Sequence, residues 1–472
     1  MRVLSNRLPR ADVSWLPELG RVSGPIYHAI ATAIGEAIRN GGLQPGDRLP
    51  PHRTLAASLA VDVTTVTRGY AEAQRQGLVE AIAGSGTFVR AEAPVLGQAG
   101  GRGIIDLTMN LPPALPGFPL GRALQDTVSR LLRQQDVGTL MSYRWGAGTA
   151  EDRAAGAAWL RPNLGRIDPQ HLLVCPGAQT AMLTILTTLT RPGDVILSER
   201  ITYPGIRALA AQLGLILHGV ECDHEGIRPD SLEEACRRFR PRLLYVNPTI
   251  QNPTTLTITP SRRRALAEAA RRQELPILED DAYGLLPSRA PAAIASFAPE
   301  LTYYVATVSK TLSPGLRIAY LLAPGHAQAM RLTAALRATS LASSGLLSGI
   351  VTSWIKSGQA TDILAAIRAE ATARQVIARS YLPETEAAAH PEGLHVWLRL
   401  PPHWQAPGFA AYVRKQGLSI VPEDAFSLDP IGRSAVRIAL GAAPDRARLG
   451  EALRAVSAAL SHHLPEAYGA VV

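Results

Sequence analysis

The feature that most constrains the fold is an alternation of short apolar segments with amphipathic helical stretches, which begins near Ile104. Five of the apolar segments are LLVC, VILS, LLYV, PILED and YYVATV. Such alternation is typical of an α/β domain with a parallel sheet covered by helices. We therefore expect an α/β domain over residues 104–472. A smaller α+β subdomain is expected at about 345–465, where Ala/Arg-rich helices mix with strands such as LHVWLRL and AVRIAL.

The first ninety residues follow a different pattern. Isoleucines spaced four apart predict a helix over Pro25–Asn40, Leu55 and Leu59 mark a second helix, and Asp62 suits the cap of a third. LVEA and TFVR on either side of AGSG predict a β-hairpin. Three helices followed by a hairpin form the outline of a winged helix-turn-helix, an α+β domain. Residues 91–103 have the composition of a linker.

Bulk properties set wide limits on function. A chain of 472 residues is too long for one core, so several domains are expected. The net charge of +9 suits contact with a polyanion without identifying one. No apolar run is long enough to span a bilayer, and the first residues do not form a signal-peptide pattern, so we expect a cytoplasmic protein. The three cysteines lack metal-ligand spacing, and no metal site is expected.

The use of lysine is unusual. Of 48 basic residues, only Lys310, Lys356 and Lys415 are lysines. Arginine supplies positive charge everywhere else, so a retained lysine suggests a task that arginine cannot perform, such as losing a proton to act as an amine nucleophile. Lys356 and Lys415 lie in polar, helix-like contexts and fit solvated charges. Lys310 lies between an apolar strand and a Ser/Pro/Gly loop, and is the candidate nucleophile.

Polar loops follow the five apolar strands. They contain, in chain order, PGAQTAM, ERITYPG, NPTIQNPTT, DAYG and SKTLSPGLR. Ligands of open α/β sheets bind beyond the carboxyl ends of the strands. This series resembles the fold-type I enzymes of pyridoxal 5′-phosphate (PLP), the aminotransferase class I/II group, over roughly residues 104–465. The resemblance implies PLP as the cofactor, bound to Lys310 as a Schiff base.

The same resemblance implies roles around the cofactor ring. Lys310 would also move protons during catalysis. Asp280 would pair with the pyridine nitrogen and keep it protonated, so that the ring serves as an electron sink. Asn252 and Tyr283 would hydrogen-bond the ring oxygen O3′, and Tyr203 would stack on the ring. Lys310, Asp280 and Tyr283 are the expected catalytic residues.

A second group of residues is implied at the phosphate. Backbone N–H groups at the start of a helix suit an anion, and hydroxyl and guanidinium groups add donors. The expected phosphate-binding residues are Ala178, Gln179, Thr307, Ser309 and Arg317.

Two further positions match the family. Tyr143 matches the tyrosine that reaches the phosphate of the partner subunit, although Asp152 replaces the leucine usual nearby. Arg437, in the strand AVRIAL, matches the arginine that binds the α-carboxylate of the substrate.

Each of these assignments has a plainer alternative. Lys310 would then be an ordinary strand-end lysine, Asp280 a helix cap, Asn252 a turn residue and Tyr203 a core tyrosine. Ala178 and Gln179 would simply open a helix. Arg317 and Arg437 would form structural ion pairs.

The N-terminal segment resembles the GntR-type winged helix throughout, most specifically in PGDRLPPHRTLA and GSGTFV. In that family the third helix enters the major groove of DNA. Val63 stands where the family often has an arginine. There are plainer alternatives for the other positions: Arg53 could form an internal ion pair, and Arg68 could be a solvated charge. Thr64 and Thr65 could simply be first-turn residues of the third helix. The expected DNA-binding residues are Arg53, Thr64, Thr65, Arg68, Gly84 and Gly86.

A winged helix followed by an aminotransferase-like domain resembles the MocR/GabR group of bacterial regulators. The resemblance implies a homodimeric transcription factor that binds a double-stranded DNA operator. It would sense PLP, or the aldimine of PLP with a small amino compound. An active aminotransferase of amino acids or amines, with an accessory DNA-binding domain, is the alternative. A binding module without PLP is a third possibility.

Overall fold

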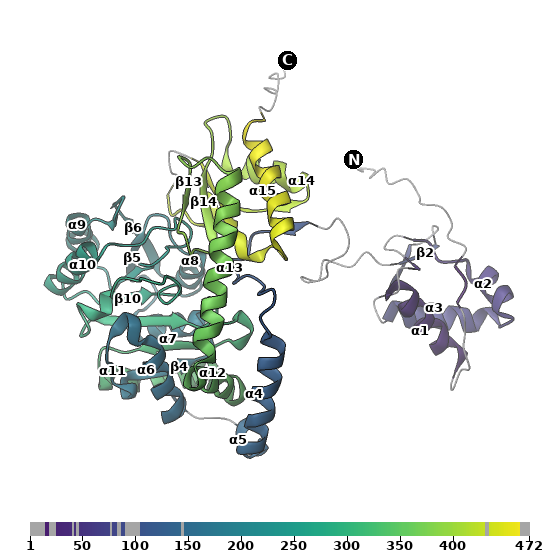
Figure 1. Cartoon of the computed structure of the whole chain (residues 1–472), viewed down its shortest axis with the longest axis horizontal. Coiled ribbons are helices and arrows are strands. Elements are labelled where there is room, and N and C mark those ends of the chain that lie inside the picture. The colour runs from purple at the N-terminus through teal and green to yellow at the C-terminus, as the bar shows by residue number, and fades with distance from the viewer. Residues whose placement is uncertain are drawn as a thin grey trace. The chain divides into compact units, whose positions relative to one another are not determined.

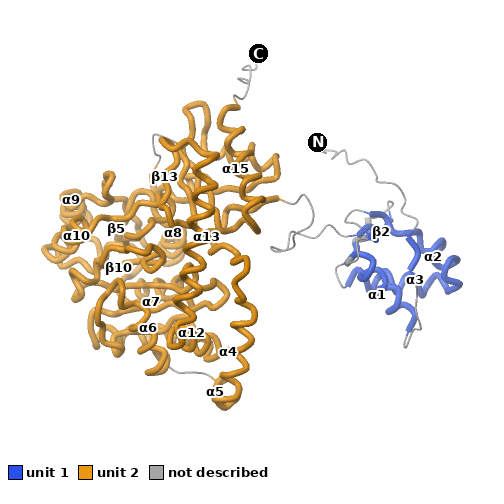
Figure 2. Tube along the Cα trace, in the orientation of Figure 1, with its two compact units in different colours: residues 1–100 blue, residues 101–472 orange. Residues whose placement is uncertain are grey.

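The computed structural model describes residues 15–17, 25–39, 42–43, 47–75, 78–82, 86–89, 104–142, 146–429 and 434–462. The chain divides into two compact units, Met1–Gly100 and Gly101–Val472 (Figure 2). Tyr143, Gly84 and the linker predicted over residues 91–103 lie outside the described residues.

The first unit contains three helices followed by a hairpin. The helices are α1 (Ile26–Arg39), α2 (His52–Leu59) and α3 (Val63–Arg75). Strands β1 (Val79–Ile82) and β2 (Gly86–Val89) pair in antiparallel fashion. The predicted winged helix-turn-helix order is confirmed.

The core of the first unit lies where α1 crosses α3. Ile30 and Ile34 of α1 and Val66 of α3 are fully buried. Ile26 is 42% exposed, so the apolar face of α1 begins one turn later than the isoleucine spacing predicts. Gly69 lets the two helices approach closely, because a Cβ there would lie 2.9 Å from Cγ2 of Ile30.

The second unit is built on a seven-stranded sheet (Figure 1). Its order is β4-β12-β11-β10-β9-β5-β6. The strands are β4 (Leu172–Cys175), β12 (Ala319–Leu322), β11 (Thr302–Thr307), β10 (Ile277–Asp280), β9 (Leu243–Val246), β5 (Val195–Glu199) and β6 (Ile216–Val220). Five of these are the predicted apolar segments.

The sheet is mixed, whereas the sequence alternation predicted a parallel one. Strand β12 runs antiparallel to both of its neighbours, β11 and β4. A parallel return needs a crossover of about a dozen residues or more, usually with a helix. Only the short segment Val308–Ile318, which contains Lys310, joins β11 to β12, so the chain reverses direction there.

Helices cover both faces of the sheet. The helices of this part are α4 (Leu120–Gln134), α5 (Val137–Met141), α6 (Ala150–Leu164), α7 (Ala178–Leu189), α8 (Pro204–Gln212), α9 (Pro229–Phe239), α10 (Pro260–Arg272), α11 (His326–Ser340) and α12 (Gly345–Ser357). Successive residues of β4 enter different cores: Leu173 packs with α7, α8 and α11, and Leu172 packs with α6, α12 and α13 (Gln359–Tyr381). Helices α9 and α10 pack beside β9 in a third core. Shorter elements are β7 (Cys222–Asp223), β8 (Gly226–Ile227) and the 3-10 turns Pro169–His171, Ile294–Ser296 and Pro314–Leu316.

A smaller subdomain follows along α13 (Gln359–Tyr381), the long helix that runs from beside α12 to the small sheet in Figure 1. Ile363 of α13 packs in the core of the larger sheet, and Ala378 packs in the core of the smaller one. The small sheet has the order β13-β14-β17-β16. Its elements are β13 (Ala387–Ala389), β14 (His395–Arg399), β17 (Ala435–Ala439), β16 (Val421–Pro422), α14 (Ala406–Lys415), α15 (Arg446–Leu460) and the 3-10 turns Glu423–Ala425 and Leu440–Ala442.

The start of the second unit also belongs to this smaller subdomain. Strand β3 (Ile105–Asp106) pairs in parallel with β15 (Leu418–Ser419). The residues that directly follow β3 are therefore held beside the small sheet.

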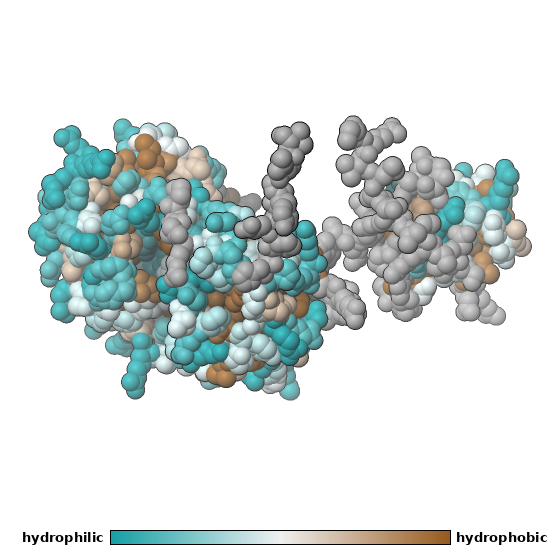
Figure 3. Space-filling view, turned by 90° about the horizontal axis from the view of Figure 1, so that it is seen from above, coloured by the Kyte–Doolittle hydropathy of each residue, from teal (hydrophilic) through white to brown (hydrophobic). Residues whose placement is uncertain are grey.

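The surface of the second unit is largely polar on the face shown in Figure 3, with separate apolar patches. Among the described residues, no helix is long and apolar enough to cross a membrane.

Candidate functional site

The carboxyl ends of neighbouring strands bring the predicted site residues to one edge of the large sheet. Asp280 ends β10, the loop that carries Asn252 follows β9, and Lys310 lies three residues beyond the end of β11. Helix α7, with Ala178 and Gln179 in its first turn, follows β4. Ligands of open α/β sheets bind at such an edge.

Lys310 contacts the segment that follows β3. Its Nζ donates a hydrogen bond to the main-chain oxygen of Asn110, at 2.5 Å. Burial, together with the positive charge of Arg437, lowers the pKa of Lys310 to about 8, although the charge of Asp280 opposes this shift. A larger fraction of the amine is therefore unprotonated near neutral pH than in an ordinary lysine, which suits a nucleophile.

Asp280 is buried and only partly hydrogen-bonded. Its Oδ2 accepts a hydrogen bond from the hydroxyl of Tyr245 at 2.8 Å. Its Oδ1 is buried without a hydrogen-bond partner among the described residues. Burial raises the pKa of Asp280 to about 6, although the Tyr245 hydroxyl lowers it. An unpartnered buried carboxylate oxygen is costly, and a cationic N–H donor would satisfy it.

The neighbouring carboxylate points elsewhere. Asp281 accepts hydrogen bonds from the hydroxyl of Tyr304 at 3.0 Å and from the amide of Asn163 at 3.4 Å. Successive residues of a strand face opposite sides of a sheet, so Asp280 and Asp281 serve different environments. This geometry separates the two consecutive aspartates that follow Glu279.

Asn252 and Arg437 are in direct contact. Nη1 of Arg437 donates to Oδ1 of Asn252 at 2.8 Å, and Nη2 donates to the main-chain oxygen of Thr108. The guanidinium carbon lies 5.0 Å from the centre of the Phe426 ring. Burial lowers the pKa of Arg437. The guanidinium has five N–H donors, so protein contacts leave donors for an anion.

Two polar side chains hold the loop that carries Asn252. Asn247 accepts the main-chain N–H of Asn252 at 2.8 Å and donates its amide to the main-chain oxygen of Asp280. The guanidinium of Arg263, fully buried, donates to the main-chain oxygens of Pro248 and Ile258, both at 2.9 Å. The loop is thus fixed to the ends of β9 and β10.

The start of α7 forms a second cluster with Arg317. Gly177, which precedes the helix, has a φ of +99°, a backbone conformation that favours glycine. A Cβ at Gly177 would lie 2.7 Å from Nη2 of Arg317. The Arg317 guanidinium therefore lies close to Gly177, at the start of α7, and a helix start favours an anion.

Thr307 and Ser309 lie at the end of β11. The Thr307 hydroxyl donates a hydrogen bond to the Ser309 hydroxyl at 2.9 Å and accepts one from the Ser309 main-chain N–H at 3.1 Å. Both side chains are buried.

Tyr203 and Gln179 meet over Gly205. A Cβ at Gly205 would lie 2.2 Å from Cε1 of Tyr203 and 2.7 Å from Oε1 of Gln179. Burial raises the pKa of Tyr203, as does the charge of Asp280, so the phenol and the carboxylate share one electrostatic environment.

This set of donors fits PLP. A partly deprotonated amine, a buried carboxylate oxygen without a partner and a glycine-lined helix start beside an arginine would suit an aldehyde, a ring nitrogen and a phosphate. The predicted residues Lys310, Asp280, Tyr283, Asn252, Arg437, Tyr203, Gln179, Ala178, Thr307, Ser309 and Arg317 all lie at this edge or contact one another through it.

Sequence reasoning did not identify Asn110, Tyr245, Asn247 and His395. The amide of Asn110 donates to the Tyr283 hydroxyl at 2.7 Å and lies 2.9 Å from Nδ1 of His395. A polar tyrosine inside the apolar strand LLYV was a usable signal for Tyr245. Nothing near Asn110 or His395 in the sequence indicates that they meet.

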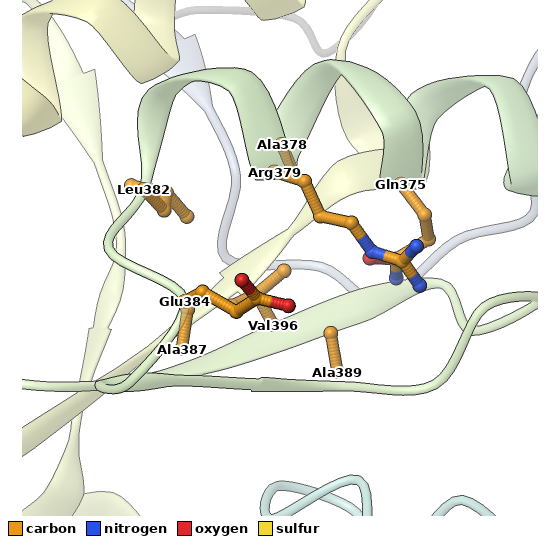
Figure 4. Close-up of a pocket in the computed structure, with 8 residues that line it drawn as sticks. All are labelled: Gln375, Ala378, Arg379, Leu382, Glu384, Ala387, Ala389 and Val396. Carbon is orange, nitrogen blue, oxygen red and sulfur yellow. The ribbon is translucent and has the colours of Figure 1, made fainter.

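A separate pocket lies on the smaller subdomain. Figure 4 shows that it is formed between α13 and strands β13 and β14, with the charged side chains of Arg379 and Glu384 among those that line it. The residues that line it are Gln375, Ala378, Arg379, Leu382, Glu384, Ala387, Ala389 and Val396. None of these is a predicted site residue.

The predicted DNA-binding residues of the first unit lie on its surface. Arg53 of α2 and Thr64 and Arg68 of α3 are exposed, and Thr65 is half-buried. Asp62 accepts both the main-chain N–H and the hydroxyl of Thr64, so it begins α3 as predicted.

The first residue of β2, Gly86, lies close to Arg48. Gly86 has a φ of +121°, and a Cβ there would lie 2.8 Å from Nε of Arg48. Arg48 also pairs with Phe88 of β2. Glycine is therefore needed at Gly86 for the backbone conformation of the hairpin.

Comparisons with known proteins agree with this geometry. The family model for aminotransferase class I and II matches residues 102–456, and that for bacterial regulatory proteins of the gntR family matches residues 26–89. The chain is 28% identical to the uncharacterized HTH-type transcriptional regulator YdeF of Bacillus subtilis, over 89% of this chain and 91% of that protein. It is also 28% identical to the vitamin B6 salvage pathway transcriptional repressor PtsJ of Salmonella typhimurium, over 86% and 92%.

Among solved structures, the chain is similar to LysN, an α-aminoadipate aminotransferase of Thermus thermophilus crystallised with N-(5′-phosphopyridoxyl)-L-leucine. The TM-score is 0.67 and the identity 27%, over 76% of this chain and 92% of that chain. The predicted architecture is confirmed: a GntR-type winged helix precedes a domain with the fold of the PLP aminotransferases.

Proposed function

Because the chain belongs to the aminotransferase class I and II family and carries a GntR-type winged helix in front of that domain, we propose that it is a PLP-dependent transcriptional regulator. The winged helix would bind a double-stranded DNA operator. The larger unit would sense PLP, alone or combined with a small amino compound. Such a regulator acts at the chromosome, so we expect it in the cytoplasm.

The observation that carries this proposal is the coexistence of two features in one chain. The Lys310 site retains a nucleophilic amine and a buried carboxylate, and the winged helix exposes arginines on its second and third helices. A relative matched along nearly its whole length, PtsJ, is named as a transcriptional repressor of vitamin B6 salvage. A sensor needs the binding residues but no fast turnover.

The residues present would hold PLP in a defined way. Lys310 would bind it covalently. Asp280 would form a hydrogen bond with its ring nitrogen, and Asn252 and Tyr283 would form hydrogen bonds with its ring oxygen. Tyr203 would stack on the ring. The phosphate would be bound by Ala178, Gln179, Thr307, Ser309 and Arg317, and by Tyr143 of a second subunit. When bound, PLP supplies an electron sink for reactions at the carbon beside an amine.

Arg437 suits the recognition of the amino compound. Its remaining N–H donors lie beside Asn252, in a setting where burial weakens competition from water. A compound with a carboxylate would form a bidentate pair there. Binding would shift the DNA affinity only as far as the compound prefers one state of the protein over another.

A homodimer fits the surface of α4 and α5. Leu124 and Leu132 of α4 are 39% and 47% exposed, and Val137 and Met141 of α5 are 51% and 73% exposed. Apolar side chains gathered on adjacent helices mark interaction surfaces. A second copy of the chain would cover them and would also supply the Tyr143 contact.

An active aminotransferase is the second candidate. The contact of Arg437 with Asn252 places a carboxylate-binding group beside the cofactor site, which turnover requires and sensing of PLP alone does not. Steady transamination of a common amino acid at enzyme-like rates would favour this reading.

Two measurements test the proposal. The purified protein should absorb in the visible range of lysine-bound PLP, and a gel shift should detect binding to DNA upstream of its own and neighbouring genes. If adding PLP or an amino compound either abolishes the gel shift or makes one appear, this would support the sensing of that compound. Absence of DNA binding at low salt under all these conditions would contradict the regulator.

A further inference from the structure

His395 lies fully buried behind the Lys310 site and has a defined contact on each ring nitrogen. Its Nε2 is 3.3 Å from the main-chain oxygen of Gln251, and its Nδ1 is 2.9 Å from the amide nitrogen of Asn110. The amide of Gln375 donates to the main-chain oxygen of His395 at 3.1 Å, which holds the residue in place.

These contacts define the tautomer of His395. Burial, together with the positive charge of Arg437, lowers the pKa of His395 to about 3, so the ring is neutral near pH 7. A neutral imidazole carries one N–H, and a carbonyl oxygen accepts hydrogen bonds but cannot donate them. The hydrogen therefore lies on Nε2, facing Gln251, and Nδ1 is an acceptor.

The tautomer in turn orients Asn110. An acceptor at Nδ1 of His395 requires the amide nitrogen of Asn110, not its oxygen, on that side. The second amide hydrogen of Asn110 is then donated to the Tyr283 oxygen, at 2.7 Å. Because this oxygen already receives a hydrogen bond from Asn110, the hydroxyl hydrogen of Tyr283 is left to point into the site.

Asn110 also contacts Lys310. The main-chain oxygen of Asn110 accepts the hydrogen bond from Nζ of Lys310. One asparagine therefore contacts both the nucleophile and the tyrosine, and His395 fixes its side chain.

We propose that His395 is a positioning residue which, through Asn110, makes Tyr283 a hydrogen-bond donor to the ring oxygen of the bound cofactor. The inference rests on the proposed binding of PLP at Lys310. A hydrogen bond donated to the ring oxygen stabilises its ionised form. Loss of His395 should therefore raise the pH at which the ring oxygen of the bound cofactor becomes ionised.

The test compares two variants of similar shape. Asparagine at this position retains an acceptor for Asn110, and leucine does not, so His395→Asn and His395→Leu differ mainly in that contact. The visible absorption of the PLP-loaded protein is titrated with pH. His395→Leu should raise the midpoint by roughly one pH unit, as expected for one lost hydrogen bond, and His395→Asn should stay within about 0.3 unit of wild type.

Other charged groups around the cofactor stay constant in this comparison. Asp280, Arg437, Tyr203 and Lys310 are present in every variant. His390→Gln changes a half-buried histidine outside this network and should leave the midpoint unchanged. Asn110→Leu removes both amide donors by a different substitution and should raise the midpoint as His395→Leu does. The double variant, His395→Leu with Asn110→Leu, should show no further rise of the midpoint, since both changes break the same chain of hydrogen bonds.

The outcomes separate the inference from the function on which it rests. A wild-type protein without the visible band would overturn PLP binding at Lys310, and the inference with it. A wild-type band with normal titration in His395→Leu and Asn110→Leu would overturn the inference alone. If His395→Leu does not fold, Asn110→Leu decides. Equal midpoint shifts in the asparagine and leucine variants of His395 would also contradict it, because shape and not the acceptor would then matter.

Discussion

Nζ of Lys310 donates a hydrogen bond to the main-chain oxygen of Asn110, a residue 200 positions earlier in the chain. Lys310 lies beyond β11 of the large sheet, and Asn110 follows β3, which pairs with β15 of the smaller subdomain. The contact thus joins the two parts of the second unit at the amine of Lys310. Any change in the placement of the smaller subdomain would alter the surroundings of Lys310.

Replacement of Asp280 by asparagine should weaken PLP binding. The variant keeps the shape and can still accept from Tyr245, but it has no charge to offer the ring nitrogen. Loss of a charge-assisted hydrogen bond should lower the affinity by about tenfold to a hundredfold. A titration of the apoprotein with PLP, followed by absorbance, measures this. An unchanged affinity for PLP would show that Asp280 does not contact the cofactor.

The same substitution should stabilise the protein without cofactor. The pKa of Asp280 is raised from 3.8 to about 6, so between these values the unfolded chain loses its proton first and stability falls as pH rises. Above pH 6 the burial of the charge costs on the order of 2–3 kcal/mol, which Asp280→Asn would recover. Denaturant unfolding of both apoproteins should show this difference at pH 7 and its disappearance toward pH 4. A difference independent of pH would contradict the assignment.

Gly177 allows a test of the helix start as a phosphate site. Gly177→Ala would strain the backbone and press on Arg317, so PLP affinity should fall about tenfold, or about 1.4 kcal/mol. Gly193 is the matched control. It also has a positive φ, +89°, but a Cβ there meets nothing within 4 Å. Gly193→Ala should lower stability and leave PLP affinity unchanged, and equal effects of both variants on affinity would argue against a specific site.

Arg68 should contribute to DNA binding through the phosphate backbone. Arg68→Ala should weaken binding about tenfold and reduce the slope of log affinity against log salt by about 1. Arg75, the last residue of α3, is exposed and already paired with Glu72. Fluorescence anisotropy with the gel-shift DNA, at several salt concentrations, compares the two variants. If Arg75→Ala is as damaging as Arg68→Ala, α3 does not meet DNA in the proposed way.

The sequence predicted those parts of the molecule that depend on local pattern. Lys310, Asp280 and Asn252 follow apolar strands, and parallel strands bring such ends to one edge. The antiparallel direction of β12 was not predicted, because it depends on the length of a connection and not on residue type. Exposure of Ile26 at the start of α1 escaped prediction because spacing does not show where packing begins.

Contacts between distant segments were the main part of the site that could not be predicted. Asn110 and His395 are 285 positions apart and meet only through the pairing of β3 with β15 and the folding of the small sheet. Neither residue lies in a recognisable pattern. Their roles follow from hydrogen-bond geometry alone.

Covalent attachment of PLP to Lys310 is the central claim, and the three lysines of the chain make it directly measurable. Purified protein would be reduced with borohydride, digested and mapped by mass spectrometry. The account predicts a phosphopyridoxyl group on the peptide that contains Lys310, its loss in Lys310→Ala and its retention in Lys356→Ala, whose lysine forms a surface ion pair with Glu151. A modification on Lys356 or Lys415, or an adduct that persists in Lys310→Ala, would contradict the account.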